Sequence, residues 1–300
     1  MLYLISISFE DRCLAVLRDL PPNNANRQAL ILDFLGYENI SPYIFNKREA
    51  LSILKQKGYP VHILDVELTR PLQALLTIEG ALARLNVRDV VFDISTMPRN
   101  YLFGICKLLS SIGLPTTIRY YRPGDYGTEL SRGIGEVSPI PGFEGNVSAM
   151  GDTVLAVVLG FEGYKALTAW ERVGPSKVIP LIGQPAYIEK FLDISRKQNS
   201  EFLEATGNPD LVPLHTHDVI AAKRQLVEVY ARVSAEAPSS SLVVCPLGTK
   251  LQSLAVFGFA YQRPEVSVIY VSSLSYFVEG YSRGYQPEFS EFSLSEVAAP

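Results

Sequence analysis

Cysteine and histidine are scarce in this sequence, and their scarcity excludes several kinds of site. Only three of the 300 residues are cysteine and three are histidine. Cys13, Cys106 and Cys245 are far apart and include no C-x-x-C pair, so neither a disulfide framework nor a cysteine-based zinc site is expected. His215 and His217 alternate on a possible strand, but zinc needs three or four ligands. No metal site is predicted.

Long apolar runs are also missing. No uncharged apolar stretch reaches the ~18 residues that a membrane-spanning helix needs. Met1–Ile7 is apolar but lacks a basic leader, and Glu10, Asp11 and Arg12 follow at once, so a signal peptide is not expected. Together with the unpaired cysteines, these absences predict a soluble cytoplasmic protein that does not act on a membrane.

The chain has no excess of positive charge. Its formal net charge of −4 argues against duplex nucleic acid as the main target, because such proteins present a basic face. A small anionic ligand remains compatible with this charge, since a few cations that converge in a groove suffice. Walker loops, G-x-G-x-x-G, nucleophile elbows and H-E-x-x-H are all absent, so no cofactor is predicted.

Three short motifs occur twice in the chain, in the same order. Ser8-Phe9-Glu10 follows the first apolar run and returns 152 residues later as Gly160-Phe161-Glu162. Two further motifs return at a spacing of 151 residues: Ser95–Arg99 as Pro246–Lys250, and Ser131-Arg132-Gly133 as Ser282-Arg283-Gly284. This regularity indicates duplication of a unit of about 150 residues, the size of one domain. Two such units can pack about a pseudo-two-fold axis, as an isologous dimer does.

Each half alternates short β-rich runs with helical patterns, which predicts an α/β fold with mainly parallel sheets. With 47% hydrophobic residues, the chain can bury two cores. We therefore predict two tandem Rossmann-like units. The expected strands are Leu2–Ile7, Ala29–Leu35, Val61–Val66, Val90–Ile94 and Thr116–Tyr121, then Thr153–Leu159, Lys177–Ile182, Ser241–Cys245 and Val266–Val271.

The domain boundaries are predicted from composition. Gly133–Met150 contains prolines and glycines without periodicity and is expected to connect the halves. The acidic, serine-rich end of the chain is expected to be a loosely held tail. The predicted ranges are 1–135 for the first unit, 136–151 for the linker, 152–286 for the second unit and 287–300 for the tail.

The first repeated motif places a glutamate, Glu10 or Glu162, between a strand and a helix. Its carboxylate could simply stabilise the helix N-terminus, by roughly 0.3–1 kcal/mol. It could instead accept hydrogen bonds from a ribose or a base, or act as a general base. Both glutamates are candidate catalytic residues, and the predicted ligand-binding set here also includes Ser8, Arg12 and Gly160.

The second repeated motif places short hydroxyls, backbone amides and one cation where a strand leads into a helix. Such a helix N-terminus is suited to phosphate. A first-turn cation opposes the helix dipole, so its recurrence needs a reason, although an exposed residue without a role is the alternative. The candidate ligand-binding residues are Asp93, Ser95, Thr96 and Arg99 in the first copy and Gly248, Thr249 and Lys250 in the second.

The third repeated motif contributes two arginines, Arg132 and Arg283, as further ligand-binding candidates. Several tyrosines surround them, and arginine with aromatic rings can stack a base and hold its phosphate. Tyrosine-rich loops also form subunit interfaces, and the sequence leaves both alternatives open.

These motifs resemble those of the CARF and SAVED families of nucleotide sensors from prokaryotic antiviral immunity. Asp93–Arg99 and Leu247–Lys250 look like two versions of the CARF signature, in which small and hydroxyl residues precede a Lys or Arg at a helix start. SAVED domains resemble two fused CARF units. Met97-Pro98 departs from the pattern, because glycines are usual there. The resemblance implies binding of a cyclic or linear oligonucleotide, with a protein effector as the partner.

Two other classes of function are compatible with the same residues. Rossmann-like domains with a carboxylate after the first strand also resemble nucleoside-transferring and nucleotide-hydrolysing enzymes, in which Glu10 or Glu162 would be the nucleophile or base. A structural subunit with degenerate pockets is the third class. Fold alone does not decide between them. Two equivalent open pockets that meet at the pseudo-two-fold axis favour a symmetric sensor, one intact and one filled pocket favours an enzyme with a relic half, and two filled pockets favour a scaffold.

Overall fold

The computed structural model describes residues 1–37, 39–127, 129–146 and 152–300. The chain forms two compact units. Unit 1 consists of Met1–Thr128 and Phe277–Glu296, and unit 2 consists of Glu129–Tyr276 and Val297–Pro300. Each unit contains one six-stranded sheet.

The sheet of unit 1 has the strand order β12-β5-β4-β1-β2-β3. Five neighbouring strands are parallel, and β12 pairs antiparallel with β5. Leu4 of β1 lies opposite Leu30 on one side and Phe92 on the other. The strands are β1 (Leu2–Ser6), β2 (Gln28–Leu35), β3 (Val61–Glu67), β4 (Val90–Asp93), β5 (Thr116–Tyr126) and β12 (Ser282–Ser293).

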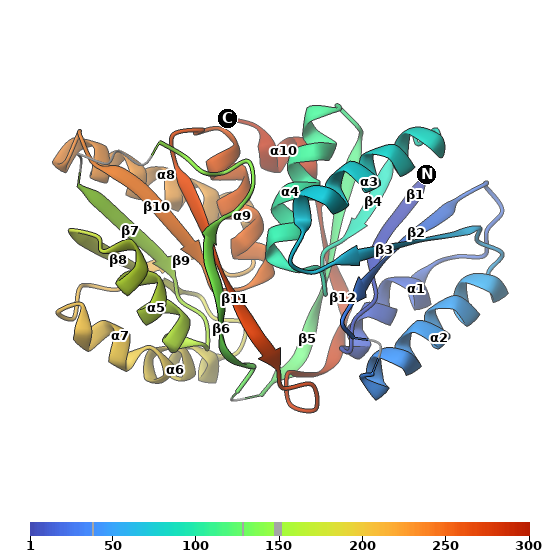
Figure 1. The fold of residues 1–300 in the computed structure, drawn as a ribbon, viewed down its shortest axis with the longest axis horizontal. Helices are drawn as coiled ribbons and strands as arrows, with labels where there is room; N and C mark the ends of the chain where they lie inside the picture. Colours follow the sequence, from blue (N-terminus) through green and yellow to red (C-terminus); the bar gives the residue numbers. More distant parts are fainter. Residues whose placement is uncertain (38, 128, 147–151) are drawn as a thin grey trace. The chain divides into compact units, whose positions relative to one another are not determined.

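Helices cover both faces of this sheet. One face carries α1 and α2, and the other carries α3 and α4 (Figure 1). Proline stands in the first turn of α2 and of α3, where its fixed φ suits the helix and no hydrogen bond within the helix is lost. The bounds are η1 (Asp11–Leu14), α1 (Ala15–Asp19), α2 (Ser41–Gln56), α3 (Pro71–Arg84) and α4 (Arg99–Ser111).

The sheet of unit 2 has the corresponding order, β6-β11-β10-β7-β8-β9. Again five strands are parallel, and β6 pairs antiparallel with β11. The strands are β6 (Ser131–Pro139), β7 (Thr153–Val158), β8 (Lys177–Gly183), β9 (Val212–Leu214), β10 (Ser241–Pro246) and β11 (Ser267–Tyr276). The helices are α5 (Gly163–Val173), α6 (Glu189–Gln198), α7 (Ser200–Ala205), α8 (Val219–Glu236), α9 (Lys250–Tyr261) and α10 (Leu294–Ala298), the last of which begins in unit 1.

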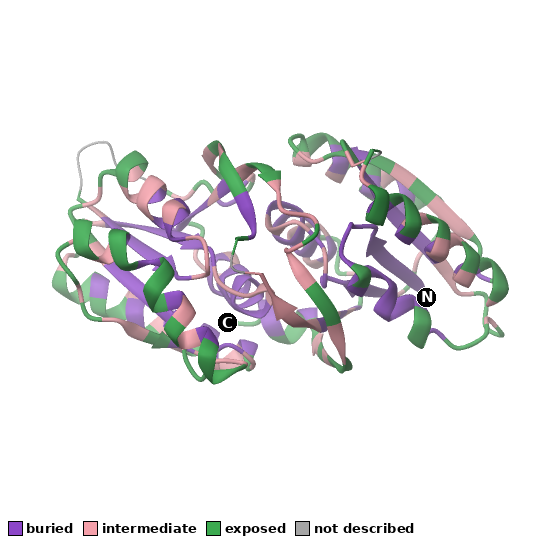
Figure 2. Ribbon diagram, turned by 90° about the horizontal axis from the view of Figure 1, so that it is seen from below, coloured by how far each residue is buried: buried purple, intermediate pink, exposed green. Residues whose placement is uncertain are grey.

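The identical strand order confirms the predicted tandem Rossmann-like fold. In each sheet the order reverses between the first and fourth strands of the repeat, β1 and β4 in unit 1 and β7 and β10 in unit 2. This reversal is the topological switch point of an open α/β sheet. The central strands β1, β4 and β10 are buried along their whole length, because helices cover both faces (Figure 2).

The last strands of the two repeats are exchanged. Strand β6 follows β5 in the sequence but pairs with β11, whereas β12 follows β11 but pairs with β5. Each sheet is therefore completed by a strand from the other repeat. This exchange also explains why the two units are discontinuous in the sequence.

The predicted linker and tail differ from the structure. Residues 131–139 form β6 of unit 2, and the predicted tail 287–300 lies largely in β12 and α10. Prolines, glycines and serines made both segments look irregular, but an antiparallel edge strand tolerates them, because its stability comes from pairing with its neighbour. Predicted linker residues 147–151 lie outside the described residues.

Candidate functional site

The first two repeated motifs lie at the switch point of each sheet, beyond the carboxyl ends of the strands. In unit 1 the loop after β1 carries Glu10, and the loop after β4 carries Ser95 and Thr96. In unit 2 the loop after β7 carries Glu162, and the loop after β10 carries Thr249. Ligands of open α/β sheets bind at this position.

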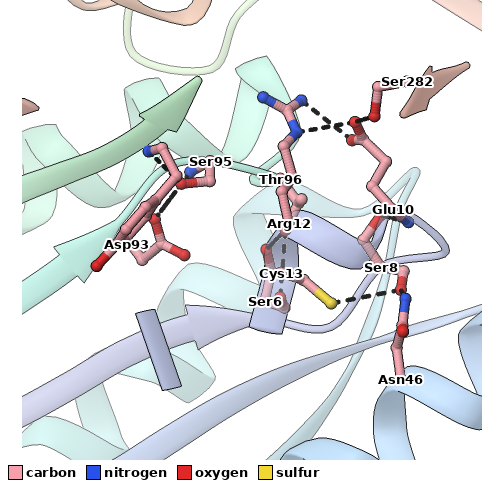
Figure 3. Close-up of polar contacts among 11 residues, drawn as sticks. Ser6, Ser8, Glu10, Arg12, Cys13, Asn46, Asp93, Ser95, Thr96 and Ser282 are labelled. Atoms are coloured by element: carbon pink, nitrogen blue, oxygen red, sulfur yellow. Dashed lines mark hydrogen bonds and ion pairs between the residues drawn. The ribbon is translucent and has the colours of Figure 1, made fainter. Parts of the chain in front are cut away.

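Glu10 and Arg12 form a buried ion pair in unit 1 (Figure 3). Arg12 Nε donates to Glu10 Oε2 at 2.9 Å, and Arg12 Nη2 donates to Glu10 Oε1 at 3.2 Å. The side chains are 2% and 6% exposed for Arg12 and Glu10, respectively. Burial lowers the pKa of Arg12, but the charge of Glu10, nearby tyrosines and the hydrogen bonds to Glu10 together hold that pKa well above its ordinary value. Arg12 therefore stays charged and neutralises the carboxylate.

The exchanged strand β12 contributes directly to this site. Ser282 Oγ donates to Glu10 Oε2 at 2.5 Å (Figure 3). Glu10 thus accepts hydrogen bonds at both carboxylate oxygens, from Arg12 and Ser282. These three hydrogen bonds fix the orientation of the carboxylate within unit 1.

The loop that carries Glu10 is fixed by the neighbouring polar groups. Ser8 Oγ accepts from Glu10 N at 3.2 Å, and Asn46 Nδ2 of α2 donates to Ser8 O at 2.9 Å. Cys13 is fully buried, and burial raises the pKa of its thiol to about 12. Ser8 therefore organises the loop, and Cys13 is not a nucleophile.

The loop after β4 turns its short side chains inward. Ser95 Oγ donates to Asp93 Oδ1 at 2.5 Å and accepts from Tyr121 N at 2.9 Å. Thr96 Oγ1 lies 3.0 Å from Ser6 Oγ. Ser95 and Asp93 are buried and bonded to the protein, so their part is to shape the loop, whereas Thr96 and Arg99 are partly exposed.

Asp93 is expected to make stability depend on pH. Burial raises the pKa of Asp93 to about 6 from 3.8, although hydrogen bonds from Ser95 act in the opposite direction. The folded state therefore binds this proton more tightly than the unfolded state does. The stabilisation is fully present below pH 3.8 and is lost as the pH rises through about 6.

We expect Asp93→Asn to remove this dependence while keeping the acceptor for Ser95. Relative to the variant, the wild type should lose about 2 kcal/mol of unfolding free energy between pH 4 and pH 7. Urea unfolding of both proteins over this range measures the difference. A constant difference across the range would show that Asp93 does not titrate there.

Unit 2 builds a similar site around Glu162. Lys165 Nζ donates to Glu162 Oε2 at 2.8 Å, and the Lys165 side chain is 6% exposed. Ser131 of the exchanged strand β6 donates to Glu162 Oε1, and Tyr164 OH donates to the same oxygen at 3.3 Å. Both units therefore combine a carboxylate, a nearby cation and a serine from the exchanged strand.

Sequence reasoning missed several residues of these sites. Lys165 and Tyr164 were not predicted as site residues. Asn46 and Asn199, which occupy corresponding positions in the two units, were not predicted either. Asn199 Nδ2 donates to Gly160 O at 2.8 Å, as Asn46 donates to the carbonyl of Ser8 in unit 1. These asparagines are 153 residues apart, so the repeat spacing was a signal that could have found them.

The two predicted phosphate loops differ in how the following helix begins. In unit 2, Thr249 and Gln252 form a capping box, in which Gln252 N donates to Thr249 Oγ1 at 3.1 Å and Thr249 N donates to Gln252 Oε1 at 2.9 Å. In unit 1 the N-cap of α4 is Pro98, which makes no side-chain cap, although Asn100 Oδ1 accepts from Tyr101 N at 3.0 Å. The first turn of α4 therefore has fewer capping hydrogen bonds from side chains than the first turn of α9.

The glycines of the unit 2 loops have a packing role. A Cβ on Gly160 would collide with Leu247 O, and a Cβ on Gly248 would collide with the side chain of Gln252. Each glycine therefore lets two segments approach closely. Lys250 is the partly exposed first residue of α9.

Arg132 and Arg283 are exposed and next to the serines that reach the carboxylates. Successive side chains of a strand point to opposite faces, so each arginine faces away from its neighbouring serine's carboxylate. Arg132 Nη2 lies 3.6 Å from Glu129 Oε2. The structure therefore groups Ser131 and Ser282, rather than the arginines, with the glutamates.

No cluster of three or more His, Cys, Asp or Glu side chains in the described part of the chain could hold a metal ion. His215 Nδ1 accepts from Asp218 N at 3.1 Å, which makes it part of the turn before α8. None of the described helices is long and apolar enough to cross a membrane.

Comparison with known proteins gives no functional assignment. No family model and no curated protein matches the sequence. Among solved structures, UDP-GlcNAc 2-epimerase from Neisseria meningitidis bound to UDP-GlcNAc is 7% identical, with a TM-score of 0.27 over 86% of this chain and 80% of that chain. CobK precorrin-6A reductase is 9% identical, with a TM-score of 0.23 over 91% and 87% of the two chains. Values this low carry no argument, and the Rossmann-like assignment rests on the strand order of the two sheets.

Proposed function

We propose that the protein binds a nucleotide, of the cyclic or linear oligonucleotide class, and acts as a sensor or regulatory subunit in prokaryotic antiviral defence. Its output would be made by a protein effector. The defence context and the effector follow from the resemblance to CARF and SAVED domains. The binding site is supported by an observation on this chain, the first turn of α4 at the switch point of unit 1.

This first turn combines the features that favour a phosphate. Arg99 opens α4 without a capping side chain at Pro98, and the hydroxyl of Thr96 lies just before it. The helix dipole and the first-turn amides favour an anion there. A cation at this position is unfavourable for the helix alone, and a bound phosphate would interact favourably with both Arg99 and the first-turn amides.

The state of Glu10 and Glu162 supports binding over catalysis. Each carboxylate is paired with a buried cation and accepts a hydrogen bond from a serine of the exchanged strand. A general base needs a lone pair directed at substrate and a pKa near the working pH. Both carboxylates are instead bonded to protein donors at both oxygens. This supports sensing over catalysis, although the inequality of the two units by itself favours an enzyme.

The test is to incubate the purified chain with a cellular nucleotide extract and to identify retained molecules by mass spectrometry. We expect a phosphate-bearing nucleotide to be retained unchanged. The matched control is Arg99→Ala, which should retain much less. Release of a chemically altered nucleotide would favour the enzyme alternative. If neither the wild type nor Arg99→Ala retained a nucleotide, nucleotide binding would be contradicted.

The arginine and the lysine of the two loops are expected to contribute unequally. Arg99→Ala should weaken binding of the retained nucleotide by about 1.5–3 kcal/mol, or roughly 10- to 150-fold, as for a lost charge-assisted hydrogen bond. Lys250→Ala should have a smaller effect, because the capping box of Thr249 and Gln252 already occupies the first turn of α9. Neither change should reduce stability, since a first-turn cation opposes the dipole.

Calorimetric titration of both variants measures this difference, and thermal unfolding provides the control for folding. Comparable losses in the two variants would indicate two equivalent sites and a symmetric sensor. Unchanged affinity in both would remove the phosphate site at these helices.

A further inference from the structure

Arg12 uses only part of its guanidinium in the ion pair with Glu10. Nε and Nη2 face the carboxylate, and Nη1 lies on the side away from it (Figure 3). Nη1 is buried and has no hydrogen-bond partner among the described residues. Arg12 is also the largest of the fully buried side chains. One cationic nitrogen with two protons is therefore enclosed without an acceptor.

Such a group is unfavourable unless an acceptor reaches it. A buried donor without a partner destabilises the folded state, and a charged donor does so more strongly. Glu10 cannot supply the acceptor, because its geometry pairs it with Nε and Nη2. Asp93 lies close enough for the charge of Arg12 to affect its pKa, but Asp93 Oδ1 accepts from the backbone and hydroxyl of Ser95.

Unit 2 lacks this feature, although its site is otherwise similar. The residue 152 positions after Arg12 is Tyr164, and the cation of unit 2 is Lys165. Tyr164 and Lys165 both bond to Glu162. In the described part of unit 2, every buried side-chain nitrogen has a hydrogen-bond partner. The spare guanidinium nitrogen thus belongs to the unit whose helix α4 also lacks a capping side chain.

We infer that Arg12 anchors an anionic phosphoryl oxygen through Nη1, and that unit 1, rather than the described part of unit 2, holds this phosphate-binding site. Binding of phosphate by Arg12 does not depend on the proposed function. Only the identity of the larger ligand, a nucleotide that carries this phosphate, rests on it. Glu10 is then a positioning residue, because it holds the guanidinium by its other edge. Guanidinium suits this task, since its planar fork bonds a carboxylate and a phosphate at once.

Entry of an oxygen requires a local movement. Nη1 is enclosed, so a neighbouring side chain must shift before phosphate contacts it. Ser282 borders the pair from β12, and its hydrogen bond to Glu10 is a contact that such a movement would disturb. We therefore expect the NMR signals of Arg12 and Ser282 to shift when phosphate is added.

The experiment uses the whole chain with inorganic phosphate as the probe, at constant ionic strength. Phosphate at about ten times its Kd should raise the Tm of the wild type by roughly 2–5 °C. Arg12→Lys should abolish this rise in Tm. The ammonium group of lysine keeps the positive charge beside Glu10 but has no second nitrogen that could donate to the phosphate. Arg119→Lys is the matched control, since Arg119 is paired with Glu291 in the same unit and should leave the rise unchanged.

A second measurement covers the case in which Arg12→Lys does not fold. In the wild type, the side-chain ¹⁵N signals of Arg12 should shift on addition of phosphate, while those of Arg119 stay. An unshifted Arg12 signal at saturating phosphate, or a full Tm rise in Arg12→Lys, would overturn the inference. Ordered water as the natural acceptor predicts that unshifted signal.

The nucleotide retained from the extract separates this inference from the proposed function. Equal nucleotide binding by the wild type and Arg12→Lys would leave nucleotide binding intact and remove Arg12 as its anchor. A phosphate response without any retained nucleotide would keep the anchor and contradict the nucleotide sensor. Calorimetry should give one phosphate per chain, and two equivalent sites would contradict the assignment to unit 1 alone.

Discussion

Truncation after Tyr281, which removes β12 and α10, is expected to unfold unit 1. The deleted segment includes residues 287–300, which the sequence predicts to be a loosely held tail, yet it forms the antiparallel edge of the first sheet. Its loss leaves the whole of β5 as an unpaired edge and removes Ser282 from Glu10. We expect the unfolding free energy of unit 1 to fall by more than about 5 kcal/mol, which is the total stability of many domains.

Specific contacts account for this large effect. The ring of Tyr121 lies 6.2 Å from that of Tyr285 and 5.4 Å from that of Phe289, measured between centroids. Arg119 Nη2 lies 2.6 Å from Glu291 Oε1 and its guanidinium stacks over Phe289. The strand therefore covers aromatic surface that would otherwise face water.

Hydrogen exchange of the β5 amides, together with urea unfolding, measures the outcome. A shorter truncation after Ser293 removes α10 but keeps β12, and it is the matched control. It should leave the protection of β5 intact, while the contacts of Lys223 with Val297 O and of Gln262 with Ala298 O are lost in unit 2. Native protection of β5 in the longer truncation would show that β12 is indeed a tail.

The sequence was sufficient to predict nine of the twelve strands in the described residues, but not β6, β9 or β12. Buried strands such as β1 and β10 are continuous apolar runs, which is typical of parallel strands that helices cover on both faces. The regular spacing then implied two Rossmann-like units, and the identical strand orders confirm that prediction. Local patterns carry this information because strand and helix periodicity are properties of neighbouring residues.

The exchange of β6 and β12 could not be predicted in the same way. Either β6 or β12 could pair with β5 or with β11, because the two repeats have the same strand order and offer similar sheet edges. Only the length and path of the connections decide between them. The same limit explains why the glutamates were recognised but their serine partners were not, since Ser282 reaches Glu10 only after the exchange.

The phosphate loops show a second limit of the sequence. Asp93–Arg99 and Pro246–Lys250 look equivalent, but one capping box distinguishes their helices. That box depends on Gln252, three residues beyond Thr249, where the first copy has Tyr101 rather than a side chain that can cap. The candidate site residues of both copies therefore stay predictions, with unit 1 favoured.

Replacing Arg12 by Ala is expected to destabilise the protein by about 3–5 kcal/mol, because it leaves the buried carboxylate of Glu10 without its countercharge. The side chains of this pair are 2% and 6% exposed, so water cannot replace the lost partner. Arg119→Ala is the control for loss of an arginine from a more exposed pair, in which Glu291 is 41% exposed. It should cost about 1 kcal/mol or less through its ion pair.

A double-mutant cycle separates the charge from the packing of the Arg12 side chain. Arg12→Met with Glu10→Gln keeps most of the volume and removes both charges, so it should recover much of the stability lost in Arg12→Met alone. Urea unfolding of the two single variants and the double variant gives the coupling free energy. If the double variant were as unstable as Arg12→Met, the cost would come from lost packing of the arginine stem. Recovery would show that the ion pair is retained for a reason other than stability, and anchoring of a phosphate by Nη1 is the reason that we propose.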